Sequence, residues 1–194
     1  MRLLLLAPPG AGKGTQGERL AAWSGVRHIA AGDLLRAQAQ AGGRLGREIA
    51  ACQARGDLVP DQIVLDVLTP AVTEAAERGG YILDGFPRTL PQAIAAAELA
   101  ARLGVTLEAA VYLYAPEAVL TPRLLDRARQ SGRADDTAEV IRHRLRVFAE
   151  TTGPLVPYYT ERGILVAVDA DQSPETVTAD IQARLSGLAR AADR

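Results

Sequence analysis

The feature that most constrains this chain is a short apolar run near the N-terminus that leads directly into a glycine-rich turn. Residues 3–7 form the run, and an unbroken run of this length is typical of a strand buried on both faces of a parallel sheet. Prolines and glycines follow at 8–12 and turn the chain. A helical pattern begins at Lys13. The order of strand, glycine-rich turn and helix predicts an α/β fold.

The turn has the properties of a phosphate-binding loop. Gly10, Gly12 and Gly14 leave the backbone uncovered, so several N–H groups can point at one anion at a helix N-terminus. Lys13 offers a mobile charge for a β- or γ-phosphate, and Thr15 a hydroxyl near a magnesium ion. Lys13 is the only lysine in the chain, which indicates chemistry that the planar arginine fork does not perform.

The match to the P-loop pattern is imperfect, because Ala7 stands at the first glycine position and Gly14 separates Lys13 from Thr15. A glycine-rich turn without a ligand is the alternative interpretation. The spacing of the glycines, the strand-to-helix order and the lone lysine favour phosphate binding.

Composition excludes several classes of function. A chain of 194 residues corresponds to one domain, and 48% apolar residues supply a sizeable core. A net charge of −1 gives no reason to expect nucleic-acid or membrane binding. Cys52 is the only cysteine, so neither an internal disulfide nor a cysteine-based zinc site is expected. The N-terminal run is too short for a membrane span or a signal peptide, and we expect a cytoplasmic protein.

Strands alternate with helices along the chain, which predicts a doubly wound, five-stranded parallel sheet flanked by helices. Residues from about 31 to 60 form a small helical insert, and 130–136 a polar loop. We expect Asp33, Asp61 and Thr89 to cap helices, with Gln92 completing a capping box at Thr89. Strands are expected at 3–7, 26–30, 81–84, 109–114 and 164–168, and helices at 13–23, 33–40, 45–55, 61–78, 89–103, 116–129, 137–162 and from 174 onward.

Charged residues follow the strand ends and the polar loops. Asp84 ends a strand, as an acidic Walker-B residue does, and could hold Mg²⁺ directly or through water; a carboxylate that caps nearby N–H groups is the alternative. The segment 123–133 contains four arginines and one acid. Such an excess suits phosphoryl transfer, in which arginine forks neutralise charge on the moving group, whereas a solvated helix face is the alternative. His28 and His143 are interpreted as packing or surface residues.

Six stretches together resemble the adenylate kinase family, in family order and over nearly the whole chain. Their specificity is high, and the Asp-Gly-Phe-Pro-Arg run alone points to nucleoside monophosphate kinases. They are Pro9-Gly10-Ala11-Gly12-Lys13-Gly14-Thr15-Gln16, Gly32-Asp33-Leu34-Leu35-Arg36, Gly56-Asp57-Leu58-Val59-Pro60-Asp61, Leu83-Asp84-Gly85-Phe86-Pro87-Arg88-Thr89, Gly132-Arg133-Ala134-Asp135-Asp136 and Pro154-Leu155-Val156-Pro157-Tyr158-Tyr159.

The resemblance implies reversible transfer of the ATP γ-phosphate to AMP, giving two ADP, with Mg²⁺ anchored through Asp84 and no zinc. It implies a core (1–29, 60–125 and 137–194), an AMP-binding subdomain (30–59), a short lid (126–136) and binding of ATP, AMP and ADP. The even charge and the lack of an obvious apolar surface stripe favour a monomer. Catalytic roles would fall to Lys13, Arg88, Arg123, Arg133 and Arg144. ATP would be bound by Gly10, Ala11, Gly12, Lys13, Gly14, Thr15, Arg123, Arg127 and Gln172. AMP would be bound by Ala31, Arg36, Asp57, Leu58, Val59, Gly85, Phe86, Pro87, Arg88, Gln92, Arg133 and Arg144.

The chain departs from the family pattern in three places. Few residues separate Arg127 from Arg133, so only a short lid without zinc fits. Ala170 replaces a family glycine, which shifts the spacing near Gln172. Ala30-Ala31 replaces the usual Ser-Thr, and the missing hydroxyl normally helps to select adenine. We therefore keep two alternatives, an AMP kinase with relaxed base selectivity and a UMP/CMP kinase.

Two further functions fit less well. A regulatory GTP switch would read guanine with an Asn-Lys-x-Asp motif, and this chain contains no asparagine and no second lysine. A catalytically inactive scaffold would not need Lys13, Asp84 and the arginines at 88, 133 and 144 together.

Overall fold

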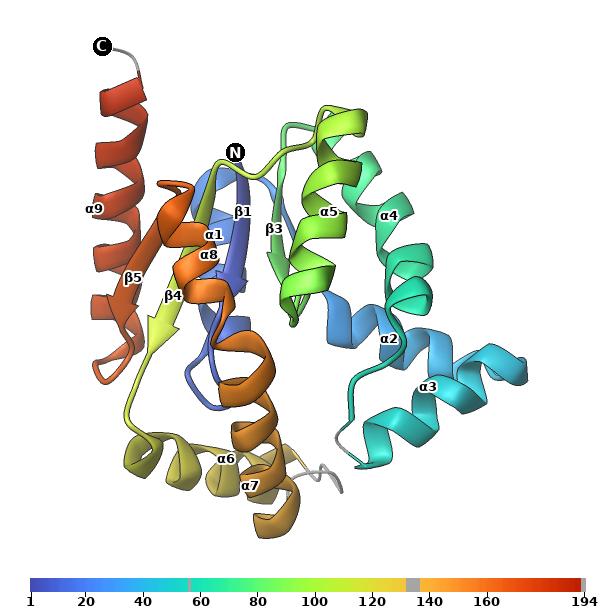
Figure 1. Ribbon diagram of the computed structural model, residues 1–194. Coiled ribbons are helices and arrows are strands. Elements are labelled where there is room, and N and C mark those ends of the chain that lie inside the picture. Colours follow the sequence, from blue (N-terminus) through green and yellow to red (C-terminus); the bar gives the residue numbers. More distant parts are fainter. Residues whose placement is uncertain (56, 132–136, 193–194) are drawn as a thin grey trace.

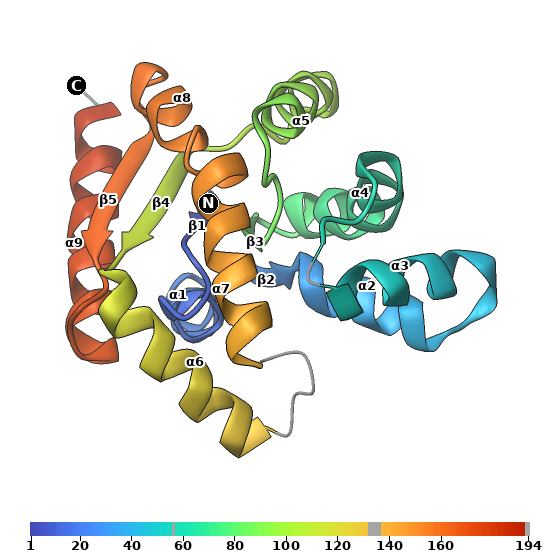
Figure 2. The ribbon, with the colours of Figure 1, turned by 60° about the horizontal axis from the view of Figure 1, so that its bottom comes forward.

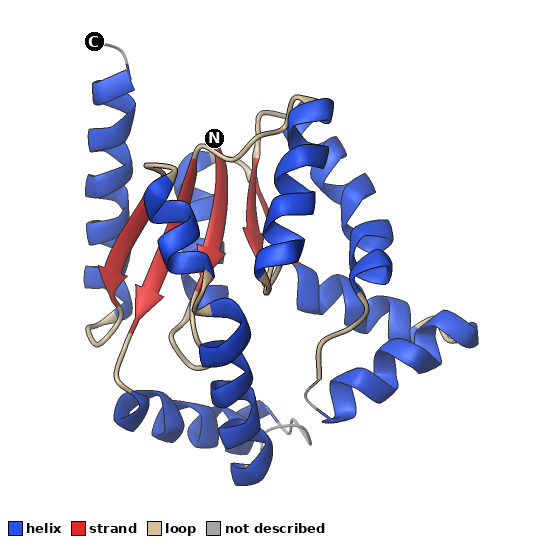
Figure 3. Ribbon diagram, in the orientation of Figure 1, coloured by secondary structure: helices blue, strands red, loops and turns tan. Residues whose placement is uncertain are grey.

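The computed structural model describes residues 1–55, 57–131 and 137–192. Strands and helices alternate from the N-terminus onward (Figures 1 and 3). The strands are β1 (Arg2–Leu6), β2 (Arg27–Ala30), β3 (Tyr81–Asp84), β4 (Ala109–Tyr114) and β5 (Leu165–Asp169). The helical elements are α1 (Lys13–Ser24), α2 (Ala31–Gln40), α3 (Gly43–Arg55), α4 (Asp61–Glu77), α5 (Leu90–Leu103), α6 (Glu117–Ser131), α7 (Ala138–Val147), the π-helical turn η1 (Phe148–Thr152), α8 (Leu155–Glu161) and α9 (Pro174–Ala192).

All five strands pair in parallel in the order β2-β3-β1-β4-β5, which confirms the predicted sheet. The central strand β1 is apolar throughout because it is covered on both faces. Leu4 and Leu6 join the core on one face, whereas Leu3 and Leu5 join the core on the other. This alternation is the two-residue period of a strand.

Helices cover both faces of the sheet (Figure 1). On one face, α4, α5 and α8 supply Val64, Leu68, Ala93 and Leu155 to the core. On the other face, side chains from α1, α6, α7 and α9 close the second core; they include Leu20, Leu120, Leu124, Ile141, Val177 and Ile181. None of the helices in the described part of the chain is long and apolar enough to cross a membrane.

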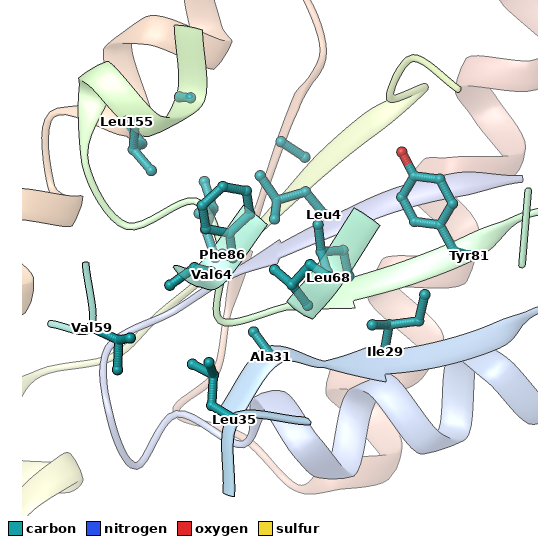
Figure 4. Packing of buried hydrophobic residues seen from close by; sticks show 14 of the residues in the cluster. Leu4, Ile29, Ala31, Leu35, Val59, Val64, Leu68, Tyr81, Phe86 and Leu155 are labelled. Atoms are coloured by element: carbon teal, nitrogen blue, oxygen red, sulfur yellow. The ribbon is translucent and has the colours of Figure 1, made fainter. Parts of the chain in front are cut away.

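Figure 4 shows the first core around Leu4, Leu68, Phe86 and Tyr81. The Tyr81 hydroxyl donates a hydrogen bond of 2.7 Å to the backbone carbonyl of Val105. Burial raises the pKa of Tyr81 to about 12, and nearby Glu108 adds to this while Arg2 opposes it. The hydroxyl therefore stays protonated and keeps its buried carbonyl partner satisfied.

The predicted helical insert is present as α2 and α3, which project beyond β2 at one side of the sheet (Figure 2). Two predicted caps in or beside it are wrong. Strand β2 runs directly into α2, so Ala30 occupies the N-cap position and Asp33 lies in the first turn. Pro60 occupies the N-cap position of α4, and Asp61 is its first residue. The predicted cap at Thr89 is confirmed, since its hydroxyl accepts from the Gln92 backbone N–H.

The long helix predicted for 137–162 is three elements. The Thr137 cap is present, but the helix changes to a π-helical turn at Phe148–Thr152 before α8 begins. Gly153 allows this turn, because a Cβ at that position would lie 2.5 Å from the carbonyl oxygen of Ala149. The polar loop predicted for 130–136 is also shorter, since α6 extends to Ser131; residues 132–136 lie outside the described residues.

We expect Leu4→Ala to lower the free energy of unfolding by about 2–5 kcal/mol, because it leaves a cavity beside the central strand. Leu4 has no exposed surface, whereas Leu103 on α5 is 45% exposed. Leu103→Ala is therefore the matched control and should cost no more than about 1 kcal/mol. Urea unfolding followed by circular dichroism measures both, and equal losses would contradict the assignment of Leu4 to the core.

Candidate active site

The glycine-rich turn joins β1 to the N-terminus of α1, as the sequence predicts. Gly10 and Gly12 both have a φ of 87°, a backbone conformation that glycine adopts without strain. Gly10 also packs closely, because a Cβ there would lie 2.9 Å from the carbonyl oxygen of Leu120. The Lys13 ammonium donates a hydrogen bond of 2.8 Å to the Ala7 carbonyl at the end of the run. The loop therefore carries its cation at a helix N-terminus, where anions are favoured.

The parallel register brings Asp84 to the same edge of the sheet. Leu5 of β1 pairs with Asp84 at the end of β3, and the Asp84 Oδ1 atom lies 4.0 Å from the Lys13 Nζ atom. The Asp84 side chain is buried, and its Oδ1 atom has no hydrogen-bond partner among the described residues. A buried carboxylate oxygen without a donor is costly and suits a cation or its water ligand.

Among the described side chains, five cationic ones line one cavity of about 520 Å³ at this edge. They come from elements far apart in the sequence: the phosphate loop, α2, the loop after β3, α6 and α7. The residues are Lys13, Arg36, Arg88, Arg123 and Arg144. Acidic residues on the same wall are fewer, namely Glu18, Asp33 and Asp84. The cavity is therefore suited to a ligand with several negative charges.

Backbone carbonyls orient two of these arginines. Arg88 Nε donates to the Gly85 carbonyl at 2.8 Å, and Arg123 Nη1 donates to the Ala170 carbonyl at 2.9 Å. A carbonyl fixes the direction of a guanidinium without cancelling its charge. Arg36 differs, since it forms an ion pair with Asp33 on the same helix.

Arg88 lies where the positive charges are most crowded. Its side chain keeps contact with solvent in the cavity, but protein surrounds it, and this loss of water lowers the pKa of its guanidinium. Asp84 opposes the shift, while Arg144 and Arg36 add to it. The crowding is unfavourable in the protein alone, and an anion placed among these groups would relieve it.

A smaller cavity of about 90 Å³ adjoins the first and shares Arg36, Arg88 and Arg144 with it. Its other walls include Asp57, Leu58, Val59, Phe86 and Gln92. The Gln92 side chain is buried, with its amide nitrogen 2.6 Å from Asp61 Oδ1 and its amide oxygen accepting from the Arg88 backbone N–H at 2.7 Å. An apolar slot with one oriented amide is suited to a planar base.

The π-helical turn also contributes to this edge. Thr152, on η1, is buried, and its hydroxyl donates a hydrogen bond of 2.9 Å to the Arg88 carbonyl. The backbone of Arg88 is thus held from both sides, at its N–H by Gln92 and at its carbonyl by Thr152. Single π-helical turns within helices occur frequently at functional sites.

The predicted site residues are not all brought together. Ala11 is buried in the second core, and Ala31 is buried beside Gly85. Gln172 does not line either cavity; its amide donates to the Asp169 carbonyl at 3.1 Å. The Arg127 side chain and all of Arg133 lie outside the described residues.

Four residues that the sequence did not single out as site residues contact the predicted ones. His28 lines the larger cavity, and His143 Nε2 lies 3.4 Å from Asp57 Oδ1. Asp61 and Thr152 bond to Gln92 and Arg88, as described above. Asp61 ends one of the six family stretches, but its contact with Gln92 joins residues 31 positions apart, and no local pattern in the sequence indicates that contact.

Comparison with known proteins agrees with this geometry. A family model described as adenylate kinase matches residues 5–164. The adenylate kinase of Synechococcus sp. (strain WH7803) is 46% identical over 185 residues, covering 95% of this chain and 98% of that relative. The adenylate kinase of Stenotrophomonas maltophilia (strain R551-3) is 43% identical over 187 residues, 96% of this chain and 100% of the relative. The adenylate kinase of Thermobifida fusca (strain YX) is 44% identical over 178 residues, covering 92% of this chain and 94% of that relative.

The chain belongs to the adenylate kinase family. Membership confirms the resemblance drawn from the six sequence stretches, and the five-stranded parallel sheet is the fold expected of an adenylate kinase. The match begins within β1 and ends one residue before β5, so it includes the residues that line both cavities.

We expect Thr152→Val to lower the free energy of unfolding by about 1–3 kcal/mol, because it removes a partly buried hydrogen bond between Thr152 and the Arg88 carbonyl. Thr160 on α8 makes a similar hydrogen bond to the Val156 carbonyl but is exposed. Thr160→Val should therefore cost about 0.5 kcal/mol or less. Thermal melting distinguishes the two, and an unchanged melting temperature for Thr152→Val would contradict the role of the π-helical turn.

Proposed function

We propose that the chain carries out the reaction of the adenylate kinase family, reversible transfer of the ATP γ-phosphate to AMP to give two ADP, in the larger cavity. The observation that carries the proposal is the convergence of Lys13, Asp84 and four arginines on one side of the phosphate loop. Such a reaction needs positioning and charge neutralisation more than covalent chemistry.

ATP is assigned to the phosphate loop, with Gly10, Ala11, Gly12, Gly14 and Thr15 around its phosphates. Lys13 bridges the transferred group, and Arg123 and Arg127 neutralise charge on the ATP side. In this assignment the backbone at Gln172 contacts the adenine of ATP. The orientation of Arg123 by the Ala170 carbonyl supports its role, since this contact leaves the guanidinium charge available.

AMP is assigned to the smaller cavity and its junction with the larger one. Arg36 and Arg88 grip the AMP phosphate, and Arg144 and Arg133 act where the phosphoryl group moves. Gln92 hydrogen-bonds the adenine. The remaining walls of the AMP site are Ala31, Asp57, Leu58, Val59, Gly85, Phe86 and Pro87. The shared arginines support this arrangement, because they lie between the two cavities.

Asp84 is the residue assigned to magnesium, through water. Its buried, unsatisfied Oδ1 atom fits a hydrated cation. Magnesium bound with ATP would supply charge neutralisation between the phosphates. The residues of the chain hold the nucleotides, orient them and exclude water, so that the phosphoryl group reaches AMP rather than water.

The family pattern also suggests how the chain is divided. The proposal treats 30–59 as the AMP-binding subdomain, 126–136 as a short lid and 1–29, 60–125 and 137–194 as the core. The projection of α2 and α3 beyond β2 supports a separate subdomain (Figure 2). Since both nucleotide sites draw on one chain, the proposal needs only a monomer, acting on cytoplasmic ATP, ADP and AMP.

We expect Arg88→Met to lower kcat/KM for AMP by a factor on the order of 10² or more, because it removes charge from the transferring phosphate. The same change should not lower the melting temperature, since the Arg88 charge is unfavourable where it lies. Arg78→Met is the control, because Arg78 is exposed at the C-terminal end of α4 and forms an ion pair with Glu74. A loss of both activity and stability in Arg88→Met would contradict the proposed role.

Base selectivity is the second expectation. Ala31 presents a buried methyl group where a hydroxyl would add a hydrogen bond worth roughly 0.5–1.5 kcal/mol, or about tenfold in discrimination. A coupled assay with ATP and each of AMP, UMP, CMP and GMP should show AMP as the best substrate, with UMP and CMP measurable. If turnover of UMP and CMP is undetectable, the hypothesis of relaxed base selectivity is wrong. If the protein prefers UMP or CMP to AMP, the alternative of a UMP/CMP kinase is favoured.

A further inference from the structure

We propose that Asp61 is a specificity-determining residue. Its carboxylate fixes the Gln92 amide in the orientation that selects bases with an amino group, adenine and cytosine, over bases with an oxo group. The inference rests on the proposed function, which places the AMP base against Gln92. Asp61 begins α4 and Gln92 lies in the first turn of α5, 31 residues later.

Two partners with fixed roles decide how the Gln92 amide points. The Arg88 backbone N–H can only donate, so the atom 2.7 Å from it is the amide oxygen. The Asp61 carboxylate accepts, so the atom 2.6 Å from Oδ1 is the amide nitrogen. A flipped amide would place oxygen against carboxylate and N–H against N–H, losing both hydrogen bonds.

After these two bonds, the amide retains one N–H and one oxygen lone pair for a ligand. Gln92 is buried, and the cavity of about 90 Å³ is where it meets open space. Adenine presents a ring-nitrogen acceptor beside an amino donor, and so does cytosine. Guanine, hypoxanthine and uracil present a ring N–H beside a carbonyl, which is the reverse pattern. When the base lies with its exocyclic group against the amide oxygen and its ring nitrogen against the amide N–H, the fixed amide pairs with the first group of bases and opposes the second.

The Asp61 carboxylate does not cap its own helix. Pro60 is at the N-cap position, and no side chain caps α4. Without Asp61, the Gln92 amide would keep only the bond from Arg88. Terminal amide torsions are broad, so a flip would then sacrifice one hydrogen bond instead of two. Asp61 therefore raises the cost of the orientation that would accept an oxo base.

The chain offers a matched control on the same helix. Asp66 accepts a hydrogen bond of 2.7 Å from the Gln62 amide nitrogen, and both side chains are exposed. The Asp66 pair has the chemistry of the Asp61 pair but does not line either nucleotide cavity. Asp66→Ala thus removes the same kind of bond from α4 without touching the base.

The experiment compares AMP with IMP, a purine nucleotide that carries the reversed donor and acceptor pattern. Affinities come from calorimetric titration and kcat/KM from the coupled assay, for the unaltered protein, Asp61→Ala, Asp61→Asn and Asp66→Ala. The unaltered protein should prefer AMP by a factor on the order of 10². In Asp61→Ala this preference should fall about tenfold, chiefly because AMP binds less well, while KM for ATP changes less than about twofold. Asp66→Ala should keep the original ratio.

An unchanged AMP-to-IMP ratio in Asp61→Ala would overturn the inference. So would an equal loss for both nucleotides, since that is the result of a purely structural role. If Asp61→Ala does not fold, as judged by thermal melting, Asp61→Asn decides: asparagine presents either a donor or an acceptor, so the ratio should again fall.

A measurement on the unaltered protein is independent of every variant. CMP should bind and react better than UMP, by about tenfold, because cytosine has the amino group; equal or better use of UMP would overturn the inference. Failure of the proposed function looks different, because the unaltered protein would then form no ADP from ATP and AMP. The calorimetric AMP-to-IMP comparison still tests Asp61 in that case.

Discussion

The parallel pairing of β1 with β3 is the constraint on which the rest of the site depends. Leu5 opposes Asp84 across this pair, so both strands end at the same edge of the sheet. The phosphate loop follows one strand, and the loop that carries Arg88 follows the other. Because the carboxyl ends of parallel strands share one edge, segments some 70 residues apart form a single cavity floor. A one-residue slip would move Asp84 away from Lys13 and turn the apolar side chains to the wrong faces.

Neutral backbone carbonyl groups orient three of the cationic side chains that line this cavity. Lys13, Arg88 and Arg123 each donate to a backbone carbonyl, whereas the Lys13–Asp84 and Arg123–Asp171 ion pairs are 4.0 Å long. Short carboxylate pairs would orient these groups as well, but they would also neutralise them. Carbonyls fix direction and leave charge available for a polyanion, which is the condition for electrostatic preorganisation. The lowered pKa of Arg88 is the cost of that arrangement.

In the proposed site, base recognition depends on a chain of hydrogen bonds that begins outside the cavity, at Asp61. Asp61 orients Gln92, Gln92 holds the Arg88 N–H, and Thr152 holds the Arg88 carbonyl. One hydrogen bond thus joins Arg88, to which we assign the AMP phosphate, and Gln92, to which we assign the base. On the other wall, the buried methyl of Ala31 adds no polar contact. Selectivity therefore relies on the direction of one amide.

The sequence alone determined the fold class, the five strands, the helical insert and the phosphate loop, because these depend on local periodicity, turn residues and motif order. The predicted caps at Asp33 and Asp61 were wrong, since strand β2 continues directly into α2 and Pro60 takes the cap position of α4. The π-helical turn was also missed; it carries Thr152, whose hydrogen bond to the Arg88 carbonyl joins residues 64 positions apart. Only the tertiary structure decided which arginines share a cavity, that His143 faces Asp57, and how the Gln92 amide points. Each of these is a contact between elements far apart in the chain, and no local pattern encodes the distance between them.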